Sequence, residues 1–267
     1  MDNPGIIRHS ENYVTTITMN SPETGNLINE ESMSLFSTYL NEAVESEECR
    51  VIIIRGKDGV FSNGLDFPEL IENFRDEIKK EFTAPYKNVL KTIHASPKPV
   101  ISAIDGSASA GGMGFVLASD VALATKVSTF ALSEVLFGLI PAIVFPFLLE
   151  RVPFKKARYL VLTSEKFDAE EACRIGIIDH VADTSENMEK KIVRYIKRFL
   201  YSSPSALSLT KQYSDKLVES RLDTSLQYAQ DTLTQLLNDK QNKEAIKTFL
   251  EGGLPDWAVR YKKRGKR

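Results

Sequence analysis

A buried strand that leads directly into a turn of small residues constrains this chain more than any other feature. The apolar run Val100–Ile104 predicts a strand that is covered on both faces. Eight Gly, Ser and Ala residues follow within Gly106–Gly114, and Met113–Ala118 has the pattern of a helix. A small-residue loop that opens a helix presents unpaired N–H groups at the positive end of the helix dipole. The stretch therefore predicts a place that binds an anion or stabilises one formed in a reaction. A tightly packed strand–helix junction fits the glycine cluster equally well.

One acidic side chain, Glu134, stands in an otherwise apolar segment twenty residues after Gly114. A carboxyl group in apolar surroundings has a raised pKa, which suits it to proton transfer. A paired structural carboxylate is the alternative interpretation. The position of Glu134 shortly after the glycine turn favours the functional one.

The loop Phe61–Asp66 contains an Asn-Gly turn and offers a second backbone donor, the N–H of Leu65. Two convergent N–H groups, one from each loop, form an oxyanion hole. Other chemistries fit less well. The chain lacks the GxSxG motif of serine hydrolases, and no acidic residue ends the strand that follows the turn, as a dinucleotide site requires.

Strand and helix patterns alternate to about residue 180, and helices dominate after that point. The predicted strands are Tyr13–Met19, Arg50–Arg55, Val100–Ile104, Val121–Ala124 and Thr129–Leu132, with an extended piece at Ile177–Val181. The predicted helices are Glu30–Ser46, a start at Phe67–Phe74, Tyr86–Ile93, Met113–Ala118, Pro141–Arg151, Phe154–Leu162, Ala169–Ile175, Ser185–Tyr201, one opened by Ser203 and Pro204, and Asp239–Leu250. The charged stretch Glu72–Glu81 is expected to be exposed. These patterns predict an α/β fold.

Composition limits the kind of protein. The 267 residues are 42% apolar and 26% charged, as in ordinary globular domains, and the net charge of −2 argues against a general nucleic-acid binder. Two distant cysteines, Cys49 and Cys173, indicate free thiols in a reducing compartment. The most apolar run, Gly138–Leu149, is too short to span a membrane, and no targeting pattern opens the chain. A cytoplasmic location is expected.

Three stretches together resemble the signature segments of the crotonase (enoyl-CoA hydratase/isomerase) superfamily: Phe61–Asp66, Asp105–Gly114 and Ser133–Pro141. Asn26–Asn29 and Ala169–Val181 also fit, so the resemblance covers essentially the whole chain. It implies a spiral core of ββα units, here residues 1–197. It also implies a C-terminal helical region, residues 198–267, that is used in trimer packing.

The resemblance also implies the chemistry of the site. An acyl thioester, carried on phosphopantetheine or coenzyme A, accepts hydrogen bonds from the N–H groups of Leu65 and Gly111. Glu134 is the acid/base group, and neither a metal ion nor another cofactor is expected. The expected substrate-binding residues are Ser62, Asn63, Gly64, Tyr86, Gly112 and Gly114.

One departure from the pattern is informative. Hydratases of this superfamily carry two glutamates, and Gly114 stands where the first belongs, so only Glu134 remains. Single-glutamate members include Δ3,Δ2-enoyl-CoA isomerases and the dehydratases of polyketide β-branching cassettes. Ala110–Phe115, Phe130–Leu139 and Pro141–Leu149 are similar to the dehydratase sequences. The companion decarboxylase usually lacks the second glutamate, so Glu134 favours the dehydratase.

This similarity implies dehydration of a 3-hydroxy-3-methylglutaryl group on an acyl carrier protein. Gly114 is expected to leave room for the substrate methyl group, and Tyr86, Lys87 and Lys91 to meet its distal carboxylate. The basic tail Arg260–Arg267 is either a solvated end or a contact for the acidic carrier protein. An isomerase acting on free coenzyme A esters, the cassette decarboxylase and a non-catalytic binding protein are the alternatives.

Overall fold

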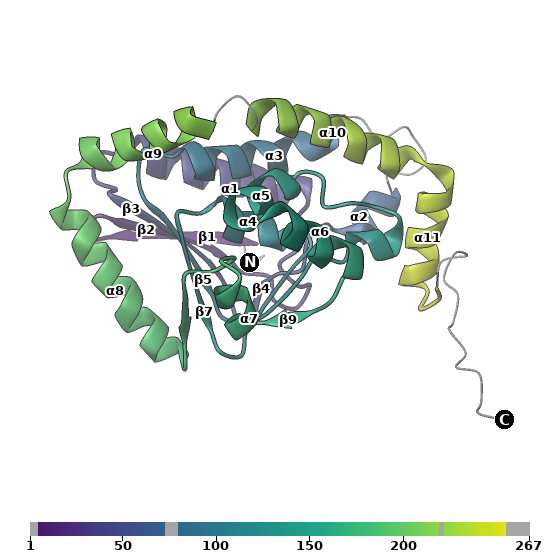
Figure 1. Cartoon of the computed structure of the whole chain (residues 1–267), viewed down its shortest axis with the longest axis horizontal. Helices are drawn as coiled ribbons and strands as arrows, with labels where there is room; N and C mark the ends of the chain where they lie inside the picture. Colours follow the sequence, from purple (N-terminus) through teal and green to yellow (C-terminus); the bar gives the residue numbers. More distant parts are fainter. Residues whose placement is uncertain (1–4, 73–79, 219–221, 255–267) are drawn as a thin grey trace.

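Six strands form the main sheet of the molecule (Figure 1). The computed structural model describes residues 5–72, 80–218 and 222–254 of the chain. The sheet order is β1-β2-β3-β5-β7-β10, and only β1 and β2 pair antiparallel. The strands are β1 Ile6–Glu11, β2 Val14–Met19, β3 Val51–Gly56, β5 Val100–Ile104, β7 Val121–Thr125 and β10 His180–Ala182.

A second sheet of four short strands repeats the order of the first. Its strands are β4 Val60–Ser62, β6 Ser107–Ser109, β8 Thr129–Ala131 and β9 Phe167–Asp168, in the order β4-β6-β8-β9. Strands β4, β6 and β8 each follow a strand of the main sheet by a few residues, and a helix follows each of them. The chain therefore winds through successive strand–strand–helix turns, which is the spiral that the sequence predicted.

Helices cover both faces of the main sheet. They are α1 Glu30–Glu45, α2 Phe67–Glu72, α3 Lys80–Ala95, α4 Gly112–Ala118, the 3₁₀ helix η2 Glu134–Phe137, α5 Phe145–Arg151, α6 Phe154–Thr163, α7 Ala169–Arg174, α8 Ser185–Tyr201, α9 Pro204–Val218, α10 Leu222–Asn238 and α11 Lys240–Leu250. On one face, Met188 and Ile192 of α8 pack against Ile53 and Leu123 of the sheet. The larger core on the other face lies beneath α1, α3 and α4.

The three last helices extend along the edge of this core (Figure 1). Helix α10 packs on α3, and α11 reaches α2 and η2. The expected division between residues 197 and 198 falls within α8. Within the described residues, no helix is long and apolar enough to cross a lipid bilayer.

The structure confirms most predicted elements and corrects several. Strand β1 was not anticipated, and α3 begins earlier than the predicted Tyr86–Ile93. The predicted helix Pro141–Arg151 is wrong at its start, because α5 begins only at Phe145. A helix from Pro141 would place Pro146 in its interior, where proline lacks the needed N–H group; in α5, Pro146 lies in the first turn instead. The predicted exposure of Glu72–Glu81 falls largely outside the described residues.

Candidate active site

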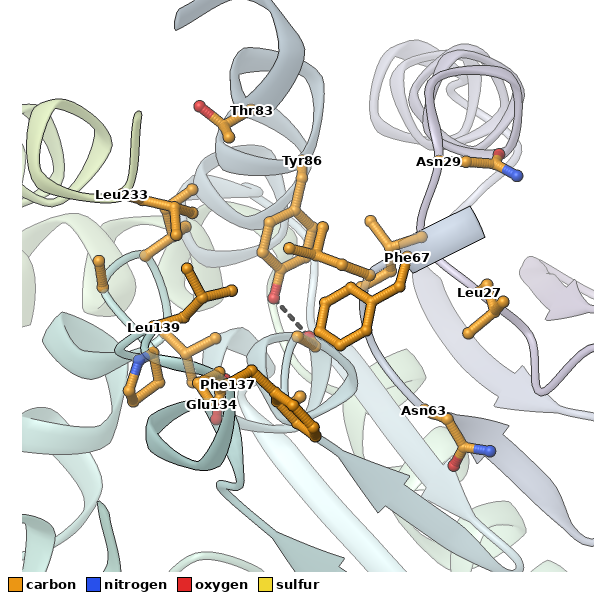
Figure 2. A pocket seen from close by; sticks show the side chains of 18 of the residues that line it. Leu27, Asn29, Asn63, Phe67, Thr83, Tyr86, Glu134, Phe137, Leu139 and Leu233 are labelled. Atoms are coloured by element: carbon orange, nitrogen blue, oxygen red, sulfur yellow. Dashed lines mark hydrogen bonds between the residues drawn. The ribbon is translucent and has the colours of Figure 1, made fainter. Parts of the chain in front are cut away.

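A cavity of about 310 Å³ lies where the second sheet, α3, η2 and the C-terminal helices meet (Figure 2). Its walls are mostly apolar. The lining side chains include Leu27, Ile28, Met33, Leu65, Phe67, Pro85, Tyr86, Phe137, Leu139, Ile143, Val144, Leu233, Phe249 and Leu250. Such a cavity excludes water and strengthens the electrostatic interactions inside it.

The N–H group of Leu65 borders this cavity without a protein acceptor in the described part of the chain. Ile28 and Leu65 form a parallel β-bridge, in which the Ile28 N–H donates to the Gly64 carbonyl and the Asp66 N–H donates to the Ile28 carbonyl. Both bonds use the neighbours of Leu65, so the N–H group of Leu65 itself faces away from Ile28. Gly64 has a φ of 94°, a left-handed conformation that glycine adopts without strain. The local backbone therefore aims the Leu65 N–H away from its own bridge partner.

Gly111, at the N-terminus of α4, supplies the second donor. Its N–H group also has no acceptor among the described residues, and it borders the same cavity. The two loops are in contact, because a Cβ atom added to Gly64 would lie 3.0 Å from the Gly111 nitrogen. The arrangement brings together two N–H donors that have no acceptor in the described ranges, as an oxyanion hole requires.

Glu134 opens η2 and contributes a carboxyl group to the cavity wall. Its Oε2 atom is buried and has no hydrogen-bond partner in the described residues. Burial raises the pKa of Glu134 to about 7, although a hydrogen bond from its own backbone N–H acts in the opposite direction. A carboxyl group with this pKa can accept a proton and return it near neutral pH.

Tyr86 is a buried residue of α3 whose hydroxyl group donates a hydrogen bond to the Gly111 carbonyl (dashed line in Figure 2). Burial, followed by the negative charge of Glu134, raises the pKa of Tyr86 well above its ordinary value. The phenol therefore stays protonated over the working pH range. Tyr86 lines the cavity, as predicted, and its hydrogen bond is made to the backbone of the oxyanion-hole loop.

Gly114 does not open space for substrate, which corrects the sequence-based expectation. A Cβ atom at this position would lie 2.1 Å from the Tyr86 hydroxyl oxygen and 2.6 Å from Cδ1 of Leu90. The side chain of Tyr86 occupies the volume that a larger residue at 114 would need.

The other predicted binding residues divide into lining and supporting roles. Asn63 lines the cavity, and its Oδ1 atom accepts a hydrogen bond from Ser107. Ser62 is buried, and its hydroxyl group donates to the Asn26 carbonyl. A Cβ atom on Gly112 would lie 2.2 Å from the Ser62 carbonyl oxygen, so Gly112 permits a close backbone approach. Ser62 and Gly112 thus support the loops and do not line the cavity.

Lys87 and Lys91 are directed to the C-terminal helices, contrary to the expectation that they meet a substrate carboxylate. The Lys87 ammonium group donates to Gln230 at 2.7 Å, and Lys91 pairs with Asp223. The charged side chains among the described lining residues are Glu30 and Glu134, and no lysine or arginine is among them. In this part of the chain, Tyr86 alone of the three predicted partners reaches the cavity.

Sequence reasoning missed the contribution of the C-terminal helices to the wall. Leu233 of α10 and Phe249 of α11 border the cavity. The Phe249 ring contacts that of Phe137 at a centroid distance of 4.5 Å, and Phe137 in turn contacts Phe67 at 5.2 Å. The sequence predicted a helix at Asp239–Leu250, but only the tertiary packing shows which cavity it borders.

Comparison with known protein families identifies the family of this chain. A family model for enoyl-CoA hydratase/isomerase matches residues 9–260. The chain belongs to this family. Its spiral fold agrees with the crotonase superfamily that the three sequence stretches indicated.

Similar proteins include both dehydratases and hydratases. Bacillaene synthase dehydratase PksH from Bacillus subtilis is 31% identical over 248 residues, which cover 91% of this chain and 93% of that protein. The mitochondrial enoyl-CoA hydratase domain-containing protein 3 from Rattus norvegicus is 30% identical, with 92% and 81% covered. The short-chain-enoyl-CoA hydratase from Clostridium acetobutylicum is 27% identical, with 94% and 96% covered.

Solved structures show the same fold. A crystal structure of the polyketide biosynthesis enoyl-CoA hydratase PksH from Bacillus subtilis has a TM-score of 0.87 at 28% identity, covering 93% of this chain and 98% of that one. An enoyl-CoA hydratase from Mycobacterium avium has a TM-score of 0.82 at 28% identity, covering 96% and 100%. The family therefore supports an enzyme of the hydratase/dehydratase type.

Proposed function

We propose that this enzyme dehydrates 3-hydroxy-3-methylglutaryl-acyl carrier protein to 3-methylglutaconyl-acyl carrier protein, the β-branching step of polyketide assembly. The observation that carries the proposal is Glu134, whose carboxyl oxygen has no partner among the described residues and which lines the same cavity as Leu65 and Gly111, whose N–H groups have no acceptor there either. The similarity to a dehydratase of bacillaene synthase supports the choice of substrate.

The proposed reaction begins with the thioester carbonyl oxygen between the N–H groups of Leu65 and Gly111. These donors stabilise the enolate, and each lowers the activation barrier by about 3 kcal/mol or less. The Glu134 carboxylate removes the α-proton, and the electrons of the C–H bond move into the enolate. Collapse of the enolate breaks the C3–O bond, and the same carboxyl group gives its proton to the departing hydroxide. Water leaves, and Glu134 returns to the carboxylate.

One carboxyl group can serve both proton transfers only when proton and hydroxyl group leave from the same face. The α3–α4 contact supports a mechanism with one carboxyl group, because Tyr86 fills the volume around Gly114 in which a second carboxylate would stand. Tyr86 itself is protonated and bonded to the Gly111 carbonyl. The proposal therefore assigns a syn elimination to Glu134 alone.

The direct test is mass spectrometry of carrier protein loaded with the 3-hydroxy-3-methylglutaryl group. The expected result is loss of one water on incubation with the enzyme and no loss with Glu134→Gln. Loss of carbon dioxide would assign the decarboxylation step instead, and an unchanged mass would refute the proposed substrate.

A second candidate is a Δ3,Δ2-enoyl-CoA isomerase. It is favoured by the apolar wall, which among described lining residues holds no lysine or arginine for a distal carboxylate. In that reaction Glu134 moves a proton from C2 to C4 of a free coenzyme A ester. Conversion of a 3-enoyl-CoA to its 2-enoyl isomer, with no action on the loaded carrier protein, would select this candidate.

The carrier protein as partner and a homotrimer as assembly belong to the same proposal. So does the division into a spiral core, residues 1–197, and a helical region, residues 198–267. The tail Arg260–Arg267, the expected contact for the carrier protein, lies outside the described residues. Deletion after Trp257 is expected to weaken carrier binding in a salt-dependent manner. Unchanged affinity would leave the tail without this role.

A further inference from the structure

The hydrogen bond from the Tyr86 hydroxyl group to the Gly111 carbonyl has no part in the proposed reaction steps. We propose that Tyr86 is a positioning residue, which holds the Gly111 segment so that its N–H points into the cavity, and that Gly114 is the glycine that admits the Tyr86 hydroxyl group. The inference deepens the proposed function and rests on it only in requiring a thioester whose carbonyl oxygen becomes anionic.

The first observation is that the Gly111 carbonyl oxygen has two donors. It accepts a hydrogen bond from the Gly114 N–H at 2.9 Å, within the first turn of α4, and a second from the Tyr86 hydroxyl group. Residue 111 has no side chain with which to fix its own orientation. The phenol therefore ties the start of α4 to α3, and it acts on the same residue whose N–H is the oxyanion donor.

The second observation is backbone strain at the preceding residue. Ala110 has a φ of 47°, in the left-handed region that non-glycine residues rarely adopt. The peptide between Ala110 and Gly111 carries the catalytic N–H group. A strained conformation persists only where surrounding contacts hold it. Those contacts include the bond from the Ala110 N–H to the Ala131 carbonyl and, one residue later, the bond from Tyr86.

The third observation is the fit between Tyr86 and position 114. The space for a Cβ atom there is taken by the phenol oxygen at 2.1 Å and the ring carbon Cζ at 3.1 Å. Tyr86 also packs its ring against Phe115 of α4, with centroids 5.8 Å apart. The hydroxyl group can reach the Gly111 carbonyl along this path only because residue 114 has no side chain.

The Tyr86 phenol is suited to positioning and not to base catalysis. Its pKa lies well above the ordinary value, so it remains a donor across the pH range of the enzyme. A single O–H group that donates to the Gly111 carbonyl cannot at the same time donate to a leaving hydroxyl group. The predicted consequence of its loss is a weaker oxyanion hole with the ring packing intact.

The test measures enolate stabilisation without any dehydration step. Acetoacetyl-CoA, a β-ketothioester, ionises to an enolate with its own ultraviolet absorbance when two N–H donors stabilise the charge. Wild-type enzyme is expected to bind and ionise it, and Tyr86→Phe to lower affinity for the enolate by roughly 10- to 100-fold. Tyr228→Phe, an exposed tyrosine on α10, is the matched control and is expected to match wild type.

The outcomes separate this inference from the proposed function. Tyr86→Phe that ionises the probe as wild type does would overturn the positioning role, and so would wild-type enzyme that binds the probe without ionising it. If Tyr86→Phe keeps full ionisation but loses turnover, the hydroxyl group acts on the substrate and the inference is wrong. Wild-type enzyme that ionises the probe but leaves the loaded carrier protein unchanged would reject only the substrate.

A pair of glycine variants tests the fit at position 114 through thermal unfolding. Gly114→Ala is expected to destabilise the wild-type enzyme and to destabilise it less in a Tyr86→Ala background, because two of the three nearest contacts of the new Cβ atom belong to Tyr86 and the third to Leu90. Gly112→Ala is the matched control, since its clash with the Ser62 carbonyl does not involve Tyr86. Equal losses for Gly114→Ala in both backgrounds would contradict the pairing.

Discussion

The η2 turn and the α3–α4 contact act on the same cavity and are built in opposite ways. At η2, the Glu134 carboxyl group is buried with an oxygen that has no partner in the described residues. At the α3–α4 contact, the three atoms nearest to a Cβ atom added at Gly114 belong to Tyr86 and Leu90 and lie 2.1–3.1 Å from it. The difference teaches that the absence of the first glutamate of the hydratase pattern, at position 114, has not left a hole. The side chain of Tyr86 fills that volume and donates a hydrogen bond to the Gly111 carbonyl.

Glu134→Gln is the change with the largest expected effect on the η2 side. It removes the only proposed proton carrier, so kcat on the loaded carrier protein is expected to fall by about 10²–10⁴-fold. Steady-state kinetics checks this, with circular dichroism to confirm the fold. Glu23→Gln, an exposed glutamate, is the control and is expected to keep wild-type kcat. A Glu134→Gln enzyme with near-normal kcat would remove Glu134 from the mechanism.

Gly64→Ala probes the oxyanion-hole side. Its new Cβ atom would lie 2.8 Å from Cβ of Ala110 and would displace the Leu65 N–H, so a loss of about 10²-fold in kcat is expected. Gly59→Ala is the matched control, because Gly59 also has a positive φ but no neighbour within 4 Å. Both variants are expected to lose about 1 kcal/mol of stability or more from backbone strain, and only Gly64→Ala to lose activity. Equal kinetics in the two variants would contradict the role of the loop.

The dependence of stability on pH distinguishes the η2 turn from the α3–α4 contact, because Glu134 changes its charge near neutral pH and Tyr86 does not. Glu134 has a folded-state pKa of about 7 against 4.5 for an unperturbed glutamate. Between these values the folded state binds more protons than the unfolded state, so this contribution to stability is full below about 4.5 and is lost as pH rises through about 7. The loss is at most about 3.5 kcal/mol, from the conversion of about 1.4 kcal/mol per pKa unit.

Denaturant unfolding of wild type and Glu134→Gln between about pH 3.5 and pH 8, a range set to bracket both values by about one unit, measures this contribution. The variant is expected to become the more stable protein as pH rises. In parallel, kcat/KM of wild type is expected to rise with pH and level off above about 7, because the base must be ionised. A constant stability difference across the range would show that the Glu134 carboxyl group is not desolvated.

Phe249→Ala on α11 has the smallest expected effect. It removes the ring contact with Phe137, and Phe249 is 44% exposed, so a loss of about 1 kcal/mol in stability is expected. A few-fold rise in KM should accompany it, because the cavity wall opens toward solvent. Leu254→Ala, another exposed apolar residue that does not line the cavity, is the control. A large fall in kcat for Phe249→Ala would mean that α11 shapes the reacting groups themselves.

The sequence predicted the elements that carry strong local patterns. They include the strand Val100–Ile104, the helix Ser185–Tyr201 and the helix at Asp239–Leu250, and the structure confirms them. Leu65, Gly111 and Glu134 were predicted to meet, and they border one cavity.

The interior packing could not be predicted in the same way. Gly114 was interpreted as space for a substrate, but what fills that space is Tyr86, whose direction depends on how α3 lies across α4. Lys87 and Lys91 were expected near the substrate because they share a helix with Tyr86. Their partners lie on α10, more than a hundred residues later in the chain, and no local pattern identifies them.

The stereochemistry of water loss tests most directly the claim that one carboxyl group serves the whole reaction. The measurement uses loaded carrier protein with a single deuterium placed stereospecifically at C2 and follows, by mass spectrometry, whether the product keeps the label. We predict loss of the hydrogen that is syn to the hydroxyl group, because Glu134 handles both proton transfers from one side. Loss of the anti hydrogen would require a second proton donor on the opposite face, and it would contradict the single-carboxylate mechanism.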